Sequence, residues 1–498
     1  MRVFLDNLPA FIVVTPLLIS ALTALIPSRL SHLAWLLALL STGISLSAAW
    51  LSKSAAEGMR ISYALGGWPP PWGIEFVTDG ASALVTVVIS GLAFVSTIYA
   101  KPLIENEISK GDIPRVYSAW QLTIGALLGL VMTADAFNLF VFLEISALSA
   151  VTLIAMGAGR DRRALVAAYN YLVIGAVGAT FYVMGVGFLY AMTGTLNMAD
   201  LADRLPDVTT RAPVYVGMAF MVAGIFVKAA VFPVHMWLPG AYGFAPTAVS
   251  ALLAAVATKA SIYVLGRLLF TVFDDLGEVT DLILNWVVLP LSLSAIFVGT
   301  ILAIWERDLK KLLAQSSIAQ IGYITLGFGL GTSAGISAGF IHIANHALIK
   351  GGMFMAVGGL AFALGRRAGI NNIEGLGRLM PVTTSALTIC GLSLIGLPLT
   401  AGFISKVYLV LAIIASEYWM IAALVLVSSA LSVIYLWKIM EAIWMKPAPH
   451  GVTINENPAV YIPLWLITIL NIWLGIDATF VTSSADAAAL ALLTGAGS

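Results

Sequence analysis

Apolar residues occur along this chain in long, nearly uninterrupted runs that short polar or Pro/Gly-rich segments separate. A run of about 17 or more apolar residues is long enough to cross the hydrocarbon core of a bilayer as a helix. The pattern predicts fourteen such spans, at 9–27, 31–51, 79–99, 117–133, 135–157, 165–192, 213–232, 245–270, 282–304, 314–330, 334–364, 381–413, 418–444 and 459–480. Several runs exceed the length of a perpendicular crossing, which indicates tilt, a break, or helix extending beyond the lipid.

Composition supports a membrane protein and excludes several other classes. The 498 residues are 60% hydrophobic and 10% charged, whereas a soluble domain carries roughly a quarter charged residues. Because lipid offers the backbone no hydrogen-bond partners, we expect an all-α polytopic membrane protein. The first run has a thin basic region and no small-residue cleavage site, so it predicts a span and not a signal peptide.

Charge and cysteine content narrow the possible chemistry. The formal net charge is zero, which argues against a nucleic-acid partner. Cys390 is the only cysteine, so neither an internal disulfide nor an iron–sulfur cluster is possible within the chain. The sequence has no Gly-rich phosphate loop, no metal-ligand cluster and no nucleophile constellation. We therefore expect no cofactor and no covalent catalysis by this chain.

Lysine and arginine divide unequally between the two sets of connections. Fifteen follow odd-numbered spans, whereas six follow even-numbered spans or lie at the termini. The six are Arg2, Lys53, Arg60, Arg204, Arg211 and Arg267. Because cytoplasmic loops are enriched in these residues, we expect the odd-to-even connections in the cytoplasm and both termini on the outer side.

Four lysines lie inside predicted spans: Lys228, Lys259, Lys350 and Lys406. Each lysine at the bilayer centre costs roughly 2.5–3.5 kcal/mol on insertion scales, so compensation by carboxylates, water or function is expected. Snorkelling of the side chain to the headgroups is the alternative. It applies best to Lys406, which lies near the end of its apolar run.

One acidic residue lies equally deep, Glu144 in "DAFNLFVFLEISALSAVTLIAM". Nine residues of helix separate it from Asp135, a rise of about 13 Å. Asp135 stands where a helix cap is common, so a capping role is as good an interpretation as a supporting role. Glu144 and Lys228 form the natural pair, since opposite charges on separate helices reduce each other's desolvation cost.

Span eleven carries a polar stripe in "GFIHIANHALIKGGMFMAVGG". His342, His346 and Lys350 recur every four residues and so share one face of a helix. A metal site is one interpretation, but no third ligand is apparent and the lysine would oppose a cation. Hydrogen-bonded core histidines are another. We favour a hydrated proton path lined by groups that both donate and accept.

Span seven contains prolines beside its lysine. In "GIFVKAAVFPVHMWLPGAYGFAP", Lys228 is followed by Pro233, His235 and Pro239. Proline removes a backbone donor and obstructs a helix, so the sequence predicts a broken helix here. In a membrane, the freed carbonyl groups need partners from protein or from a water-filled cavity.

Span twelve repeats this feature in "CGLSLIGLPLTAGFISKVYLV", where Pro398 precedes Lys406. The two breaks lie five spans apart, an odd offset that places them in opposite orientations. This predicts two inverted five-helix repeats, spans 4–8 and 9–13. The expected organisation is residues 1–116 for spans 1–3, 117–270 and 282–444 for the two repeats, and 459–498 for span 14 and a C-terminal tail.

Six blocks of this sequence, in order, resemble the antiporter-like membrane subunits of respiratory complex I, membrane-bound hydrogenases and Mrp-type multisubunit cation/proton antiporters. They are "DAFNLFVFLE" with Glu144, "VKAAVFPVHMWLPGAY" with Lys228, "APTAVSALLAAVATKASIYVLGR" with Lys259, "RDLKKLLAQSSIAQIGYITLG", "HIANHALIKGGMF", and "GLPLTAGFISKVYL" with Lys406. The likeness covers about spans 3–13. It is greatest to the D subunits of the Mrp antiporters, because Gly240 stands where complex I subunits usually have aspartate.

The resemblance implies a component of a multisubunit antiporter in the prokaryotic cytoplasmic membrane, which exchanges Na⁺ or K⁺ for protons alongside other membrane subunits. The implied proton path consists of Glu144, Lys228, Lys259, His342, His346, Lys350 and Lys406. Two alternatives remain: a proton-pumping component that redox chemistry drives in an NADH:quinone oxidoreductase or membrane-bound hydrogenase, and a non-transporting scaffold in a membrane assembly.

Overall fold

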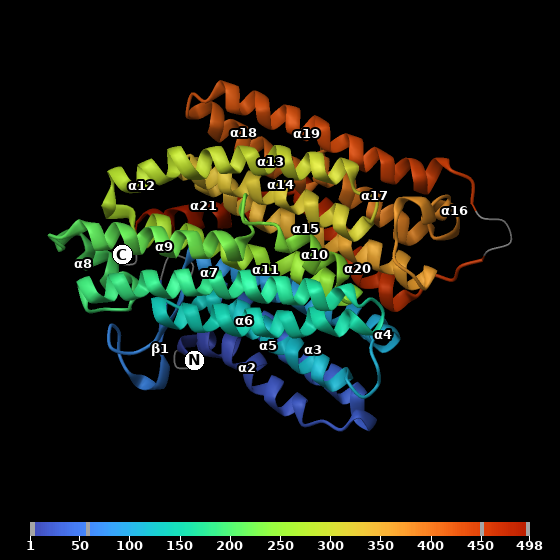
Figure 1. Ribbon diagram of the computed structural model, residues 1–498, viewed down its shortest axis with the longest axis horizontal. Helices are drawn as coiled ribbons and strands as arrows, with labels where there is room; N and C mark the ends of the chain where they lie inside the picture. The colour runs from blue at the N-terminus through green and yellow to red at the C-terminus, as the bar shows by residue number, and fades with distance from the viewer. Residues whose placement is uncertain (1–4, 56–59, 449–452, 495–498) are drawn as a thin grey trace.

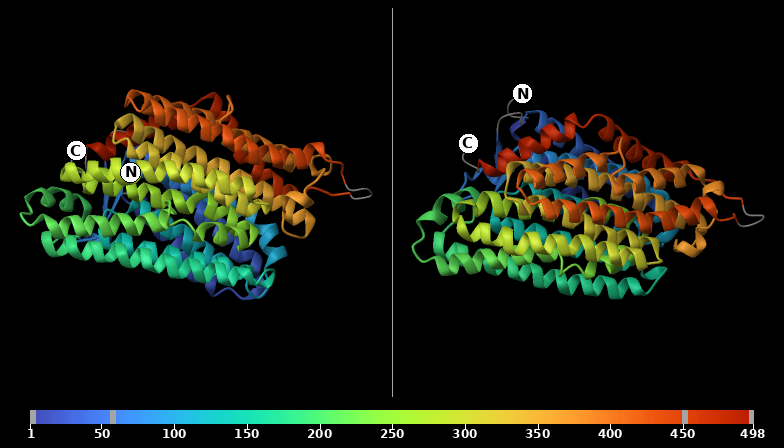
Figure 2. Two further views of the ribbon diagram at one scale, coloured as in Figure 1. Left: turned by 45° about the horizontal axis from the view of Figure 1, so that its top comes forward. Right: turned by 90° about the horizontal axis from the view of Figure 1, so that it is seen from above.

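The computed structural model describes residues 5–55, 60–448 and 453–494, so Arg2 lies outside the described residues. The membrane helices are α2 (Leu8–Ala24), α3 (Ser31–Ala55), α4 (Gly80–Glu107), α5 (Ile113–Met132), α6 (Ala136–Ala155), α7 (Arg163–Thr193), α9 (Arg211–Ala229), α10 (Trp237–Phe244), α11 (Thr247–Arg267), α13 (Leu289–Trp305), α14 (Leu309–Gly329), α15 (Ser333–Leu364), α17 (Pro381–Ile395), α18 (Ala401–Ala415), α19 (Trp419–Met440), α20 (Pro458–Ile476) and α21 (Thr479–Leu493). They run side by side along the long axis of the molecule (Figures 1 and 2). Each predicted apolar run coincides with a helix or a pair of helices, which confirms the all-α polytopic prediction.

Short elements occupy the connections. The strands β1 (Ile61–Ala64) and β2 (Glu75–Thr78) form an antiparallel hairpin after α3, and the helices α8 (Met198–Arg204), α12 (Glu278–Ile283) and α16 (Leu376–Leu379) lie elsewhere between spans. In Figure 1, β1, α8 and α12 lie at one end of the bundle and α16 lies at the other. The first three follow even-numbered spans and α16 follows an odd-numbered one. This alternation is the arrangement that fourteen consecutive crossings require.

Among the described helices, ten are long and apolar enough to cross a membrane by length and composition. Four shorter apolar helices are α2, α17, α18 and α21. The short lengths of α17 and α18 arise because span twelve is broken. The remaining two spans are α5 and α14, of 20 and 21 residues, whose sequences carry more polar side chains.

The predicted break in span seven separates α9 from α10. Ala230 has a left-handed backbone with φ 55°, and Pro233 follows within the irregular segment. The indole Nε1 of Trp237 donates to the carbonyl oxygen of Val227 at 2.9 Å, and so supplies a partner for the end of α9. Pro239 lies in the first turn of α10, where its missing N–H has no helical acceptor. Pro239 is therefore part of the second half-helix and not of the break.

The predicted break in span twelve separates α17 from α18 and contains Pro398. Gly396 has φ 95° and Leu399 has φ 67°, both in the left-handed region. Asn345 of α15 reaches into this break, and its Nδ2 donates to the carbonyl oxygen of Ala401 at 2.6 Å. In each five-span segment, every helix packs against the next along the chain.

Span fourteen is also interrupted, which the sequence did not predict. The chain continues past residue 480 as α21, so residues 479–493 are helical and not an extended tail. Helix α20 packs against α15, α4, α17 and α18, whereas α21 packs against α15 and α4. In Figure 1, α21 lies in the half of the bundle nearer α8, and α20 lies in the other half. Together α20 and α21 form one interrupted crossing beside α15.

The close approach of the two halves of span twelve makes Gly402 a sensitive position. A β-carbon added there would lie 1.8 Å from the carbonyl oxygen of Ser393, whereas Gly187 of α7 has nothing within 4 Å. Overpacking costs typically about 1–3 kcal/mol. We expect Gly402→Ala to lower the thermal midpoint of the purified complex and Gly187→Ala to leave it unchanged. Equal midpoints for the two variants would contradict this packing.

Candidate functional site

The four lysines inside the spans are all buried, and each donates to a backbone carbonyl oxygen. The Nζ atom of Lys228 lies 3.5 Å from Leu143 O, that of Lys350 lies 3.0 Å from Leu313 O, and that of Lys406 lies 2.8 Å from Ile395 O; Lys259 donates to Ala254 O. Within the described part of the chain, none of the four forms an ion pair with a carboxylate at 4.0 Å or less. Each ammonium group is therefore held by a carbonyl dipole and not by direct contact with a carboxylate.

Glu144 and Lys228 are neighbours but not in contact. Lys228 binds the carbonyl group of Leu143, the residue that precedes Glu144 in α6. Glu144 is half-buried, and its Oε1 has no hydrogen-bond partner among the described residues. The two charges are close enough to interact electrostatically. The structure thus places the two residues within electrostatic reach without an ion pair between them, and their role as a pair stays a prediction.

Two of these lysines lie on half-helices beside the breaks, and the break of span twelve explains how one of them is held. Lys228 lies one residue before the end of α9. Lys406 lies on α18, but its Nζ reaches the carbonyl oxygen of Ile395, the last residue of α17. The C-terminal end of a helix carries a partial negative charge that stabilises a cation. The Lys406 ammonium group therefore lies at the C-terminal end of α17, whereas the Lys228 ammonium group binds the carbonyl oxygen of Leu143 within α6.

The polar stripe of α15 faces α14 and α18. His342 Nδ1 lies 2.8 Å from Ser405 Oγ, and His342 Nε2 lies 3.0 Å from Gln320 Oε1. The rings of His342 and His346 stack in parallel with centroids 5.9 Å apart. Both ring nitrogens of His346 are buried without a hydrogen-bond partner among the described residues. The two histidines of the predicted stripe are therefore buried side by side, and only His342 has hydrogen-bond partners among the described residues.

Lys350 and Lys406 lie at opposite ends of this pair of histidines. The Lys350 ammonium group donates to Ser316 Oγ at 2.5 Å, and the Lys406 ammonium group donates to Ser429 Oγ at 2.6 Å. Lys406 Nζ also lies 5.1 Å from the ring centroid of Tyr323, a distance typical of a cation–π contact. The Tyr323 ring in turn packs edge-on against His342, 5.8 Å away.

Sequence reasoning missed the polar face of α14. Ser316, Gln320 and Tyr323 recur at intervals of four and three residues, so they share one face of that helix. This face binds Lys350, His342 and Lys406 in turn. The helical spacing of these uncharged residues was the available signal, but such residues are common in membrane helices and do not stand out.

The other predicted site residues lie at the margins of this row. Lys259 of α11 interacts electrostatically with His346 and Lys350 but is joined to neither by a direct hydrogen bond within the described residues. Asp135 caps α6, since its Oδ1 accepts from the backbone N–H of Asn138 at 2.6 Å. This geometry favours the capping interpretation of Asp135.

His235 lies inside the break of span seven. It is 3% exposed, its ring stacks on Phe232 with centroids 5.3 Å apart, and neither ring nitrogen has a hydrogen-bond partner among the described residues. It is a buried imidazole beside the irregular backbone that follows Lys228.

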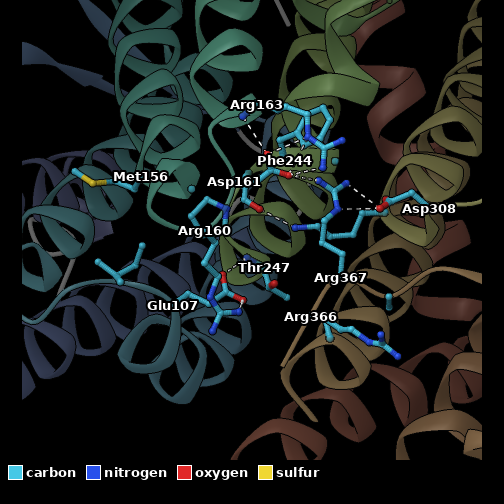
Figure 3. A pocket seen from close by; sticks show the side chains of 18 of the residues that line it. Glu107, Met156, Arg160, Asp161, Arg163, Phe244, Thr247, Asp308, Arg366 and Arg367 are labelled. Carbon is cyan, nitrogen blue, oxygen red and sulfur yellow. Dashed lines mark hydrogen bonds and ion pairs between the residues drawn. The ribbon is translucent and has the colours of Figure 1, made fainter. Parts of the chain in front are cut away.

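A cavity of about 730 Å³ opens at the end of the bundle that carries the connections after odd-numbered spans (Figure 3). Its wall contains an ion-pair network in which Arg367 binds Asp161 at 3.0 Å and Asp308 at 2.8 Å. Hydrogen bonds from Arg163 hold the pKa of Asp161 below its usual value. Three cations, Arg163, Lys311 and Arg367, lie over the ring of Phe244, which follows the break of span seven.

Helix α14 joins the wall of the cavity to the buried lysines and histidines. Lys310 lines the cavity, is 9% exposed, and donates to the carbonyl oxygen of Ala245 at 2.7 Å. Leu313, whose carbonyl group binds Lys350, lies one helical turn further along the same helix. Sequence reasoning assigned Lys310 to a loop, because its burial depends on the connection between α10 and α11.

The fold and the buried lysines and histidines are those of a membrane subunit of the transporter or pump class. A family model described as NADH:quinone oxidoreductase/Mrp antiporter, TM, matches residues 133–432. The chain belongs to this family.

Two relatives and one solved structure show which members of the family this chain is similar to. The N subunit of the NADH-quinone oxidoreductase of Desulforudis audaxviator (strain MP104C) is 40% identical over 461 residues, covering 91% of this chain and 89% of that protein. The D subunit of the Na(+)/H(+) antiporter of Bacillus subtilis (strain 168) is 28% identical over 491 residues, covering 97% of each. A chain of the Mrp complex from Dietzia sp. DQ12-45-1b matches with a TM-score of 0.89 and 25% identity, covering 98% of both chains.

Proposed function

We propose that this chain is the proton-translocating subunit of a multisubunit antiporter that exchanges Na⁺ or K⁺ for protons. The observation that carries the proposal is the set of four buried lysines without an ion-paired carboxylate among the described residues. Two of them, Lys350 and Lys406, contact the polar face of α14, which also binds His342. Intramembrane ionisable residues that line such a row are typical of proton relays. The similarity to the D subunit of a Na(+)/H(+) antiporter over 97% of both chains supports the antiporter class.

In this proposal Glu144 and Lys228 form the gate. Movement of Glu144 toward Lys228 favours the protonated lysine, and movement away favours release of its proton. The proton passes to Lys259, then along Lys350, His346 and His342. Because no direct hydrogen bond joins Lys228, Lys259 and this row within the described residues, each of these transfers requires bound water or side-chain motion.

Lys406 receives the proton at the far end of the row. Its contacts with Ser429 and with the end of α17 hold the ammonium group beside the break of span twelve. Irregular backbone at membrane depth occurs where protein covers it or where it lines a water-filled cavity. In this proposal the proton leaves Lys406 toward the outer side.

A second candidate differs only in the source of energy. The 40% identity to the N subunit of an NADH-quinone oxidoreductase favours a proton-pumping component that redox chemistry in other subunits drives. The buried row serves either function, because both require protons to cross the same bilayer.

The native complex, purified and reconstituted into vesicles, separates the two candidates. An antiporter is expected to dissipate a preset pH gradient when Na⁺ or K⁺ is added, without any electron donor. A redox-driven pump is expected to show flavin or iron–sulfur absorbance and to build a pH gradient only when an electron donor and quinone are supplied. Cation-independent, donor-dependent pumping would contradict the antiporter proposal. A complex that moves no protons under either condition would contradict both candidates.

A further inference from the structure

The break between α17 and α18 and the break between α20 and α21 lie side by side on the exposed lateral surface of the bundle. Gly475, near the end of α20, packs so closely against Thr400 that an added β-carbon would lie 2.3 Å from the Thr400 backbone. Leu397 and Leu399, in the break of span twelve, are 45% and 67% exposed. The interruption between α20 and α21 follows Gly475 by one residue. The surface here consequently consists of irregular backbone from two different spans.

The side-chain carboxylate of Asp477 lies beside these two breaks. Asp477 occupies the junction of α20 and α21 and is exposed. One of its oxygens, Oδ1, accepts from the backbone N–H of Thr479 at 3.0 Å. The side chain of Thr479 is a second hydrogen-bond partner. An ionised carboxylate offers about four acceptor sites, so these contacts leave part of its capacity open. Trp473 and Ile476 beside it are 47% and 68% exposed.

The depth of this carboxylate follows from the helix lengths. Helices α17 and α18 have 15 residues each, so the break between them lies near the middle of span twelve. Gly475 packs on Thr400 at that level, and Asp477 follows two residues later. Ten residues beyond Asp477, Ala487 of α21 lies against Gly80, the first residue of α4. Asp477 is therefore inside the depth of the bilayer.

A surface with irregular backbone and an exposed carboxylate is unfavourable in contact with lipid. Irregular backbone and ionisable side chains at membrane depth occur only where protein or water covers them. Aspartate has too short a side chain to reach the headgroups from this depth. The bulky apolar neighbours Trp473 and Ile476 favour a protein cover over a water-filled cavity.

We propose that a transmembrane helix of another subunit, carrying a lysine or arginine at this depth, covers the surface formed by Leu397, Leu399, Trp473, Ile476 and Asp477. A cation from the partner satisfies the open side of the carboxylate and removes the cost of an unpaired charge. A second copy of this chain fits less well, because a two-fold interface would place two Asp477 carboxylates against each other. The proposal holds for either energy source, since it concerns assembly alone.

Photo-crosslinking in the native membrane tests the proposal. A benzophenone amino acid is placed at Leu399 or Ile476 in the full complex, with Val177 of the unbroken helix α7, 47% exposed, as the matched control. We expect adducts with another subunit of the complex at both test positions in clear excess over the control position. Adducts only with lipid, or with a second copy of this chain, would overturn the proposal.

Charge reversal tests the role of the carboxylate itself. We expect Asp477→Lys to reduce the amount of other subunits that copurify with the tagged chain by about tenfold, because two unpaired cations then meet in the membrane. Asp477→Asn should give a smaller loss. Asp486→Asn is the matched control, since Asp486 is an exposed carboxylate of α21 that already accepts from Ser337 Oγ at 2.5 Å. Unchanged copurification with Asp477→Lys, at equal levels of the chain in the membrane, would overturn the proposal.

Discussion

Replacing Lys228 with alanine is expected to reduce proton translocation by the assembled complex about tenfold or more. Lys228 lies near the end of α9, and its ammonium group binds Leu143 O of α6 in electrostatic reach of Glu144. Alanine removes the group that takes and releases the proton and leaves the Glu144 carboxylate without its neighbour. The measurement is the initial rate of pH-gradient change in vesicles that contain the complex.

Lys228→Arg separates proton transfer from charge placement. Arginine keeps the positive charge but does not release a proton in proteins. If Lys228 carries protons, the arginine variant is expected to be about as inactive as alanine. If the lysine only holds helices together, arginine is expected to restore most of the rate. Wild-type activity in either variant would contradict the gate proposal.

Lys438→Ala is the matched control for this experiment. Lys438 also donates to backbone carbonyl oxygens, to Ile304 at 3.3 Å and to Glu306 at 3.1 Å, but it lies near the end of α19 and outside the buried row. Its removal tests the loss of a lysine–carbonyl contact alone. We expect transport close to the wild-type rate, with equal amounts of assembled complex in each membrane.

The spans and the buried lysines could be predicted because their signals are local. A long apolar run is sufficient to define a membrane helix, and a lysine within it stands out by its cost. Pro233 and Pro398 marked two breaks for the same reason, since proline acts on its own helix. Pro239 did not extend the first break, because a proline in the first turn of a new helix is tolerated.

The partners of these lysines could not be predicted, because they depend on which helices pack together. Nothing in the sequence distinguishes the carbonyl groups of Leu143, Leu313 and Ile395 from those of other residues. Asn345, which reaches across to the break of span twelve, is likewise an ordinary polar residue until α15 and α18 pack together. The interruption before α21 was missed because Asp477 lay close to the end of an apolar run, where a carboxylate ordinarily marks the membrane boundary.

Replacing Lys350 with methionine is expected to stop proton transfer along the buried row, with at least about a tenfold loss of transport. Methionine keeps much of the volume of the side chain but removes the group that binds Ser316 and Leu313 O. Transfer between Lys259 and the histidines then has no titratable group at this position. Wild-type transport with Lys350→Met would show that protons bypass this part of the row.

Two adjacent hydroxyl groups allow a finer test of the same contact. Ser316 and Ser317 are both buried and both donate to Leu313 O, at 3.0 Å and 2.9 Å, but only Ser316 accepts from Lys350. A hydrogen bond to a charged group contributes about 1.5–3 kcal/mol. We therefore expect Ser316→Ala to lower the transport rate about tenfold and Ser317→Ala to leave it near the wild-type value. Equal rates for the two variants would show that Lys350 works without its hydroxyl partner, whereas the expected difference would make the polar face of α14 a functional part of the proton path.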